Sequence, residues 1–538
     1  MKNIVKKIYA VLAIIALGVT MSSCSDWLNY TPKDKQSEEQ QFATKSGIYA
    51  AVNGIYNQMS TSELYGKNLS YEFIDILGQR YEVNQTDETG YAKYCRALVA
   101  YDYTESTVES TIAAIWSKAY HVIMNINVVL KNLDADQAAD GSHVLTEDDY
   151  KMLRGEMLAC RAMLHFDMLR LFGPACTLSP EGRGIPYNES TDTQILPILT
   201  VSDVLNNYII RDIEDAKTLL AATDPVIEFG PRAEYGEDSD DNSKRYRQLR
   251  LNYYAVTLLA ARAYQWGGNN AEAYNNAIAL VEDANVQKYF PPVDAGTLLG
   301  NTTTPDRMFT TECLFGFYND DRGLIYDYHF GQENSGRSLL VPRAGYVDEQ
   351  LFSGADVGDY RYQSQWENGT TLDGDATKRF LKYKDIADEN RDVVSGSTSD
   401  ENEILKAQKF YGTFCSAMKL SEAYYIASET AMALGKELQG WILLNEMRKR
   451  RGVPELDPSY DYSDVMTKEY IREYIGEGQV FFYFKRLNKS FDNVYNGQKR
   501  IEIAIMPPFI YSDKEEVSEE KKMQRYTLPL PKSETDNR

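Results

Sequence analysis

The feature that most constrains the fold of this chain is a recurring pair of amphipathic helices. Apolar side chains at steps of four and three residues line one face of a helix, and this spacing joins Leu153, Met157, Cys160, Leu164, Met168 and Leu171. The pattern returns at 254–261 and 420–434, where Gly267 and Gly435 end it, and a second helical run follows each glycine. The sequence therefore predicts helix–turn–helix pairs with glycine at the turns.

Two of these pairs resemble tetratricopeptide units, which are about 34 residues long. They lie at 250–284 and 418–452. A plain solenoid keeps its repeats adjacent, because each repeat buries its apolar face on its neighbour. Here the repeats are separated by long stretches rich in Gly, Asp and Asn that also carry aromatic residues, at 60–107, 173–200, 222–246 and 286–415. We therefore predict a mostly α fold, with a tetratricopeptide-like helical-repeat scaffold on which long irregular insertions form a ligand-binding lobe.

The N-terminus has the pattern of a bacterial lipoprotein signal. Three lysines precede an apolar run at 8–19, which is too short for a bilayer core that needs about 20 residues and fits a secretory signal. Small residues and then Cys24 follow. We predict a signal peptide at 1–23, a lipidated tether at 24–36 that begins with the modified Cys24, and a single composite domain at 37–538. The alternative is an ordinary signal peptide with a chance cysteine.

Composition excludes several other classes of protein. The chain has 57 Lys and Arg against 79 Asp and Glu, a net charge of −22, and an acidic surface repels phosphate backbones, so we expect no nucleic-acid partner. Lipid on Cys24 leaves five widely spaced cysteines, which is no disulfide framework. With no C-x-x-C motif and four histidines, the chain has little with which to bind zinc. We expect no metal and no cofactor, and attachment to a membrane through the N-terminal lipid only.

Motifs of catalysis are also missing. The sequence has no G-x-S-x-G elbow, no P-loop and no G-x-G-x-x-G. A glycoside hydrolase needs two carboxylates, and Glu469, Glu473 and Glu477 stand one helical turn apart. We expect these three to form a structural face that pairs with Arg472, Arg486 or their neighbours. The basic run at 448–451 ends a predicted helix, where cations are favourable. We therefore predict that the chain is not an enzyme.

Several segments match a known family in order and spacing. The chain resembles the SusD/RagB family of outer-membrane nutrient-binding lipoproteins over nearly its whole length. The matching motifs are Cys24-Ser25-Asp26-Trp27-Leu28, Phe172-Gly173-Pro174, the helix pair at 250–284, Ser421-Glu422-Ala423-Tyr424, Glu477-Gly478 and Leu528-Pro529-Leu530-Pro531. The chain departs from the family at Val480, where an arginine is usual, so an ion pair typical of the family is missing.

The resemblance implies a specific function. Members of the family lie on the outer surface of Gram-negative cells, act as a lid on a SusC-like TonB-dependent transporter, and pass it oligosaccharides or, in some branches, peptides. We therefore expect a lipid-anchored outer-membrane protein that faces the cell exterior and delivers oligosaccharides to such a transporter. Peptide capture is the alternative. A glycoside hydrolase, or a helical-repeat scaffold that binds only its protein partner, is the less favoured interpretation.

Aromatic side chains are the expected ligand contacts, because tyrosine offers an apolar face together with a hydroxyl group and the chain has 40 tyrosines. The resemblance places such contacts on loops after the first helices and in the central insertion. The candidates are Asp75, Arg80, Tyr81, Tyr91, Tyr94, Tyr326, Tyr328, Arg343, Tyr346, Tyr360 and Trp366. Trp366 is the strongest of them, because it lies in a polar run at 363–369. For each aromatic candidate the alternative is a buried or incidental ring.

Overall fold

The fold is described by a computed structural model for residues 38–82, 90–192, 194–231, 244–300, 305–320, 322–331, 339–371, 374–384, 412–489 and 518–536. Two compact units make up the chain, Met1–Ala51 and Val52–Arg538. In the first unit, the described residues form α2 (Glu38–Phe42) and the first part of α3 (Lys45–Met59). The predicted signal peptide, Cys24 and the tether at 24–36 lie outside the described residues. The predicted single domain at 37–538 stays a prediction.

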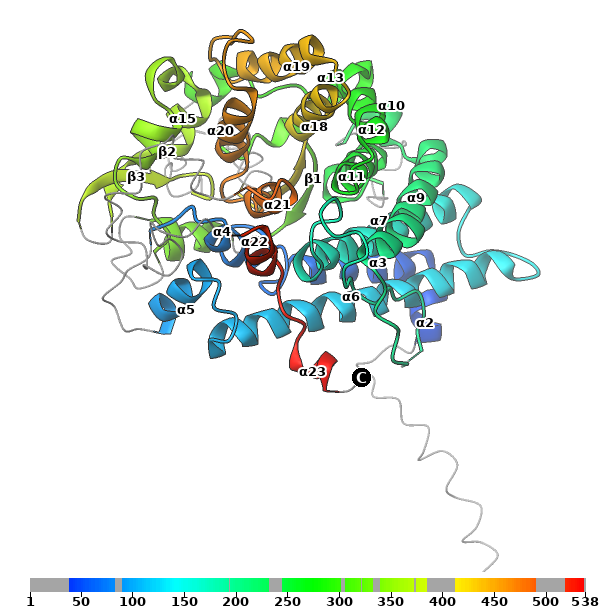
Figure 1. The fold of residues 1–538 in the computed structure, drawn as a ribbon. Helices are drawn as coiled ribbons and strands as arrows, with labels where there is room; N and C mark the ends of the chain where they lie inside the picture. Colours follow the sequence, from blue (N-terminus) through cyan, green and yellow to red (C-terminus); the bar gives the residue numbers. More distant parts are fainter. Residues whose placement is uncertain are drawn as a thin grey trace, which may run out of the picture. The chain divides into compact units, whose positions relative to one another are not determined.

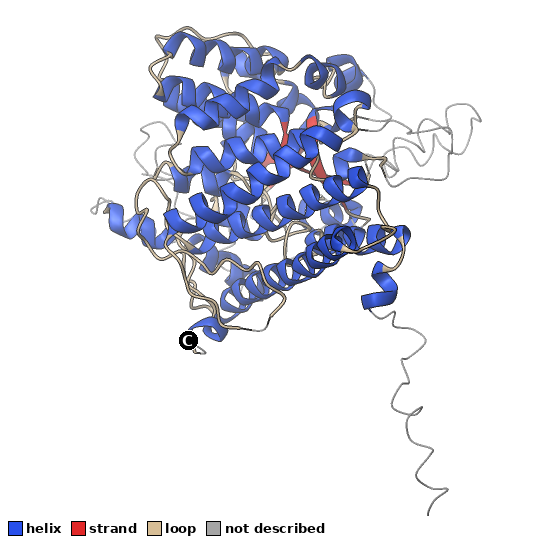
Figure 2. Cartoon of the chain, turned by 90° about the vertical axis from the view of Figure 1, so that its right-hand side faces the viewer, coloured by secondary structure: helices blue, strands red, loops and turns tan. Residues whose placement is uncertain are grey.

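Helices dominate the described part of the second unit (Figure 1, Figure 2), which confirms the predicted mostly α fold. The longer helices are α6 (Ser106–Ala138), α7 (Glu147–Phe172), α9 (Ile210–Thr223), α11 (Tyr253–Trp266), α12 (Asn270–Glu282), α18 (Leu420–Ala433), α19 (Glu437–Arg450) and α20 (Tyr462–Tyr474). The shorter ones are α4 (Phe73–Leu77), α5 (Gly90–Val99), α8 (Val201–Asp203), α10 (Val226–Phe229), α13 (Ala284–Tyr289), α14 (Arg322–Ile325), α15 (Tyr360–Gln365), α21 (Val480–Arg486), α22 (Glu519–Tyr526) and α23 (Lys532–Thr535). Short 3-10 or π turns are η1 (Val204–Ile209), η2 (Arg247–Leu249), η3 (Gly296–Gly300), η4 (Thr310–Glu312), η5 (Tyr326–Phe330), η6 (Tyr346–Leu351) and η7 (Gly354–Gly358).

Helix α7 lies at the centre of the scaffold. Its N-terminus is capped by the side chain of Thr146, which accepts a hydrogen bond from the Asp149 amide at 3.2 Å. Every residue from 155 to 172 is buried, because α7 packs between α6 and α9. Its last turn ends before Gly173, where the amino group of Lys485 donates to the carbonyl oxygens of Arg170 and Gly173 at 2.6 and 2.7 Å. A buried amino group thus satisfies the free carbonyls of the helix end.

Both predicted helix pairs form, as α11 with α12 and α18 with α19. Helix α12 packs on α18, so two pairs that the insertion at 286–415 separates in sequence are neighbours in space (Figure 1). The approach of α19 to α18 depends on Gly440, where a Cβ atom would lie 2.5 Å from the sulfur of Met432. Continuous stacking of helix pairs is therefore kept, and the insertion leaves the stack and returns to it.

The insertion at 286–415 contributes most of the described strands. Strand β1 (Cys313–Tyr318) pairs antiparallel with β4 (Phe414–Lys419), and β2 (Trp366–Thr370) pairs antiparallel with β3 (Ala376–Phe380). The second sheet puts Trp366 opposite Phe380 in register. Both rings lie on the buried face, because side chains on a strand alternate between its two faces.

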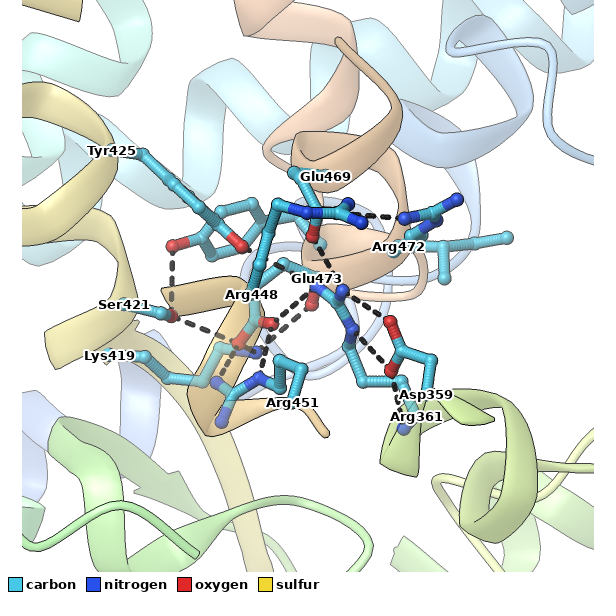
Figure 3. Close-up of polar contacts among 12 residues, drawn as sticks. Asp359, Arg361, Lys419, Ser421, Tyr425, Arg448, Arg451, Glu469, Arg472 and Glu473 are labelled. Carbon is cyan, nitrogen blue, oxygen red and sulfur yellow. Dashed lines mark hydrogen bonds and ion pairs between the residues drawn. The ribbon is translucent and has the colours of Figure 1, made fainter. Parts of the chain in front are cut away.

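A buried network of ion pairs joins this insertion to the end of β4, to α19 and to α20 (Figure 3). Its members, which we call the core ion network, are Glu312, Asp356, Asp359, Glu469, Glu473, Glu477, Arg361, Lys382, Lys419, Arg448, Arg451 and Arg472. All except Asp356 are almost fully buried, and carboxylates and cations are equal in number. The three glutamates of α20 and its following turn are therefore structural, as predicted, whereas Arg486 pairs with Glu429 instead.

Two glutamates, Glu469 and Glu473, form half of the ion pairs in this network. Glu473 contacts Arg451, Lys419 and Arg361 at 2.8 to 3.1 Å, and Glu469 contacts Arg361, Arg472 and Arg448 at 2.5 to 2.7 Å. Burial alone would raise the pKa of Glu469, but the three arginines outweigh it and lower the pKa to about 2. The same balance holds the pKa of Glu473 well below its ordinary value. Both carboxylates therefore stabilise the fold above their ordinary pKa, and this stabilisation is lost as the pH falls towards 2.

The turn after α20 anchors the other long insertion. In this turn, Gly476 and Gly478 donate their amides to the carboxylate of Asp75 on α4, the second at 3.2 Å. Both glycines have positive φ, and a Cβ on Gly478 would lie 2.3 Å from the carbonyl oxygen of Leu69. Burial raises the pKa of Asp75 to about 7, although these amides and Arg80 oppose the rise. Asp75, which was predicted as a ligand contact, thus pins α4 to the turn.

The core ion network generates a first prediction. Replacing Glu473→Gln leaves three buried cations without their shared carboxylate, so we expect the free energy of unfolding in urea to fall by about 3–5 kcal/mol. The control is Glu446→Gln, which removes a carboxylate that is 43% exposed and pairs with Arg450 at 3.2 Å. Exposed pairs contribute about 0–1 kcal/mol, so equal losses in the two variants would contradict the importance of the network.

A second prediction concerns pH. Because the pKa of Asp75 is raised in the fold, its contribution is fully present below the ordinary carboxyl pKa and is lost as the pH rises through about 7. Asp75→Asn keeps an acceptor oxygen without the charge. We expect the stability of the wild type, relative to this variant, to fall by at most about 1.4 kcal/mol per pH unit between about pH 5 and about pH 7. Urea unfolding across this range measures it, and the exposed Asp215→Asn variant should keep the wild-type slope.

Candidate functional site

The two long insertions meet in a cluster of aromatic rings. The insertion at 60–107 contributes Tyr71, Tyr81, Tyr91 and Tyr94, and that at 286–415 contributes His329, Phe330, Trp366, Phe380 and Tyr383, and we call these nine residues the aromatic cluster. Tyr71 lies 5.4 Å from His329 and 5.2 Å from Tyr383 between ring centroids. The structure therefore brings together the two regions from which the ligand contacts were predicted.

Polar contacts fix the same junction. Arg80, which is 2% exposed, donates to the hydroxyl of Tyr346 at 2.6 Å and to the carbonyl oxygen of Gly78 at 2.5 Å. The amide of Glu82 donates to the carbonyl oxygen of Val341 at 2.7 Å. The bonds to Tyr346 and Val341 cross from one insertion to the other, so buried groups determine how the two insertions lie relative to each other.

Most of the predicted contact residues are buried where the two insertions meet, and we call this buried part of the junction the buried base. The side chains that are at most 9% exposed are Asp75, Arg80, Tyr81, Tyr94, Tyr326, Tyr346 and Trp366. Trp366 packs on Phe380 at 4.9 Å, and the hydroxyl of Tyr326 donates to Glu367 at 2.9 Å. Burial gives each of these residues a structural role, and a direct ligand contact by any of them stays a prediction.

Tyr328 is the predicted residue that solvent reaches best, with 60% of its side chain exposed. It lies on η5, directly after the short helix α14, whose Leu324 is also exposed. Tyr91 on α5 is half-buried, and its ring lies 6.3 Å from that of the half-buried His329. We call Tyr91, Tyr328 and His329 the ligand rim. Tyr91 and His329 lie ring beside ring at the edge of the aromatic cluster, and Tyr328, the chain neighbour of His329, adds an exposed ring, whereas the hydroxyl of Tyr91 is buried.

Two other candidates lie outside the rim. Tyr360 packs against the buried residues Val293, Leu298 and Phe309, on the side of the core ion network. Arg343 is half-buried, with its guanidinium 5.8 Å from the ring of Tyr346. The prediction missed His329 and Tyr71. The run at 326–330, in which four of five residues carry rings, was the signal that could have found His329.

The described residues also bear on metal binding and on membrane insertion. Among the described positions, no group of three or more His, Cys, Asp or Glu side chains is arranged to hold a metal ion. All five cysteines that the structure describes are buried thiols without a disulfide. No helix within the described ranges is both long and apolar enough to span a bilayer. The predicted lipid site, Cys24, lies outside these ranges.

Comparison with known proteins identifies a family that the chain matches. A model of the SusD family matches residues 232–538, more than half of the chain, and a model described as starch-binding associating with outer membrane matches residues 26–237. SusD-like protein P25 of Formosa agariphila is 22% identical over 345 residues, which cover 62% of this chain and 56% of the relative. The chain thus spans little more than half of that relative's length.

Solved structures show the same fold at low identity. A SusD superfamily protein from Bacteroides vulgatus has a TM-score of 0.63 at 21% identity, covering 92% of this chain and 97% of that one. A SusD-like carbohydrate binding protein from the same species has a TM-score of 0.59 at 18% identity, covering 83% and 84%. Binding proteins of the SusD family are non-catalytic, in agreement with the prediction that this chain is not an enzyme. By the match over its C-terminal half and the shared fold, the chain belongs to the SusD family.

Proposed function

We propose that the chain is a cell-surface lipoprotein that binds oligosaccharides and delivers them to a SusC-like TonB-dependent transporter in the outer membrane. The observation that carries the proposal is the ligand rim, in which exposed and half-buried rings stand on a rigid buried base where two insertions meet. A pyranose ring has an apolar face of C–H groups that stacks on such rings, and its hydroxyl groups bond to tyrosine and imidazole. The family description, starch-binding associating with outer membrane, supports the same ligand class and location.

Tyr328 provides the test of the ligand. Tyr328→Ala removes the most exposed ring of the rim without opening a cavity, so we expect an affinity roughly tenfold weaker, about 1.4 kcal/mol, with an unchanged melting temperature. Affinity electrophoresis against a panel of polysaccharides identifies the ligand, and calorimetry with oligosaccharides of the retarding polymer measures the loss.

Tyr460→Ala is the matched control for this test. Tyr460 is 53% exposed in the loop between α19 and α20, outside both insertions. We expect this variant to keep the wild-type affinity. If no polysaccharide in the panel retards the protein, oligosaccharide binding is wrong, and enrichment of a peptide from a random library would then favour peptide capture. Equal affinities of Tyr328→Ala and wild type would place the ligand elsewhere.

The proposed anchor and transporter are tested together in cells. We expect the tagged full-length protein to fractionate with outer membranes and, after mild detergent extraction, to copurify with a large TonB-dependent barrel. Cys24→Ser cannot be lipidated, so we expect it in the soluble fraction, because stable attachment of a chain like this needs its acyl chains. Wild-type protein that is purified from membranes without a barrel would remove the transporter from the proposal, and membrane-bound Cys24→Ser would contradict lipidation at Cys24.

A further inference from the structure

In the insertion that carries Tyr328 and His329, carboxylates are exposed and cations are not, as the described part of 305–384 shows. In the described part of 305–384, no Lys or Arg side chain is exposed, because each one is buried or half-buried. The same residues include exposed carboxylates at Asp320, Asp327, Asp348, Glu349 and Asp375. One of them, Asp327, lies directly between Tyr326 and the rim residue Tyr328. The exposed charged side chains in the described part of 305–384 are therefore all negative.

The half-buried cations of this region already have partners within the fold. Lys378 contacts Asp348 at 3.8 Å and Asn368 at 2.8 Å, and Arg307 donates to the carbonyl oxygen of Ser364 at 3.0 Å. Arg343 and Lys384 lie 5.8 and 5.7 Å from the ring centroids of Tyr346 and Tyr326. A bound anion would have to draw these groups away from contacts that hold the lobe together.

The cations of the insertion at 60–107 also have partners within the fold. Lys67 pairs with the buried Glu72 at 3.0 Å, and Lys93, which is 61% exposed, pairs with Glu105 at 3.5 Å. Arg80 is buried on Tyr346. Recognition of a carboxylate or sulfate normally uses an arginine or lysine that is free to form charge-assisted hydrogen bonds. Among the described residues of both insertions, each such group is buried, half-buried or paired with a carboxylate, except Lys288, which is exposed and donates to the hydroxyl of Tyr289 at 3.0 Å.

From this arrangement we infer that the site takes uncharged glycans and rejects anionic ones such as polyuronates and sulfated polysaccharides. The inference rests on the proposed function and deepens it by naming the class of ligand. A neutral polyol stacks on the rim and donates its hydroxyls to nearby carboxylates, which are strong acceptors. An anionic polymer meets the exposed carboxylate of Asp327 next to Tyr328, and a chain with net charge −22 at long range.

Pairs of polymers that differ mainly in charge provide the test. Affinity electrophoresis of the full-length protein would compare highly methyl-esterified pectin with polygalacturonate, and hydroxyethyl cellulose with carboxymethyl cellulose. Starch, xylan and mannan extend the neutral set, and chondroitin sulfate extends the anionic set. Runs in about 0.15 M salt limit long-range repulsion to a Debye length of about 8 Å. Tyr328→Ala shows whether retardation passes through the rim.

We expect at least one neutral polymer to retard the wild type, with at least tenfold weaker retardation of Tyr328→Ala, and no anionic polymer to retard either. Retardation by polygalacturonate, carboxymethyl cellulose or chondroitin sulfate would overturn the inference while leaving oligosaccharide binding in place. Neutral binding that Tyr328→Ala does not weaken would also overturn it, because the rim would then not be the site. Retardation by no polymer at all would overturn the proposed function itself.

Discussion

The pairing of Glu473 with Arg361, Arg451 and Lys419 is the interaction on which the rest of the structure depends. An insertion of more than a hundred residues leaves the stack of helix pairs after α12 and returns at α18, and apolar packing alone would hold it in several nearly equivalent positions. Ion pairs that are buried on both sides have only one good arrangement, because any shift leaves a charge without its partner. The core ion network therefore fixes the place of the insertion as well as contributing to its stability.

The turn at 475–478 connects the core ion network to the two insertions that carry the ligand rim. Lys382, at the end of β3, donates to Glu477 at 2.6 Å and to the carbonyl oxygen of Ile475 at 3.3 Å. The hydroxyl of the adjacent Tyr383 donates to the carbonyl oxygen of Gly476 at 2.5 Å. On its other side the turn donates its amides to Asp75 and thereby holds α4. One turn thus binds both insertions, and the aromatic cluster forms because its two halves share this anchor.

The sequence predicted what local spacing determines. Apolar periodicity and glycine positions predicted α7 and both helix pairs, and the spacing of Glu469, Glu473 and Glu477 predicted a structural face. It could not name their partners, because Arg361 and Lys382 lie roughly a hundred residues away along the chain and no periodicity connects them. The burial of Trp366 was missed for a related reason. Its polar neighbours suggested exposure, but in a strand the ring and its neighbours point to opposite faces, and pairing with β3 turned the ring inward.

The proposed ligand rim is separate from the buried residues that hold the two insertions together. Tyr71 and Phe330 are nearly inaccessible and contact several other rings, so a change in either would disturb the packing of both insertions. Tyr328 has most of its side chain in solvent, and its replacement leaves that packing intact. A substitution at the rim therefore alters recognition at little cost in stability.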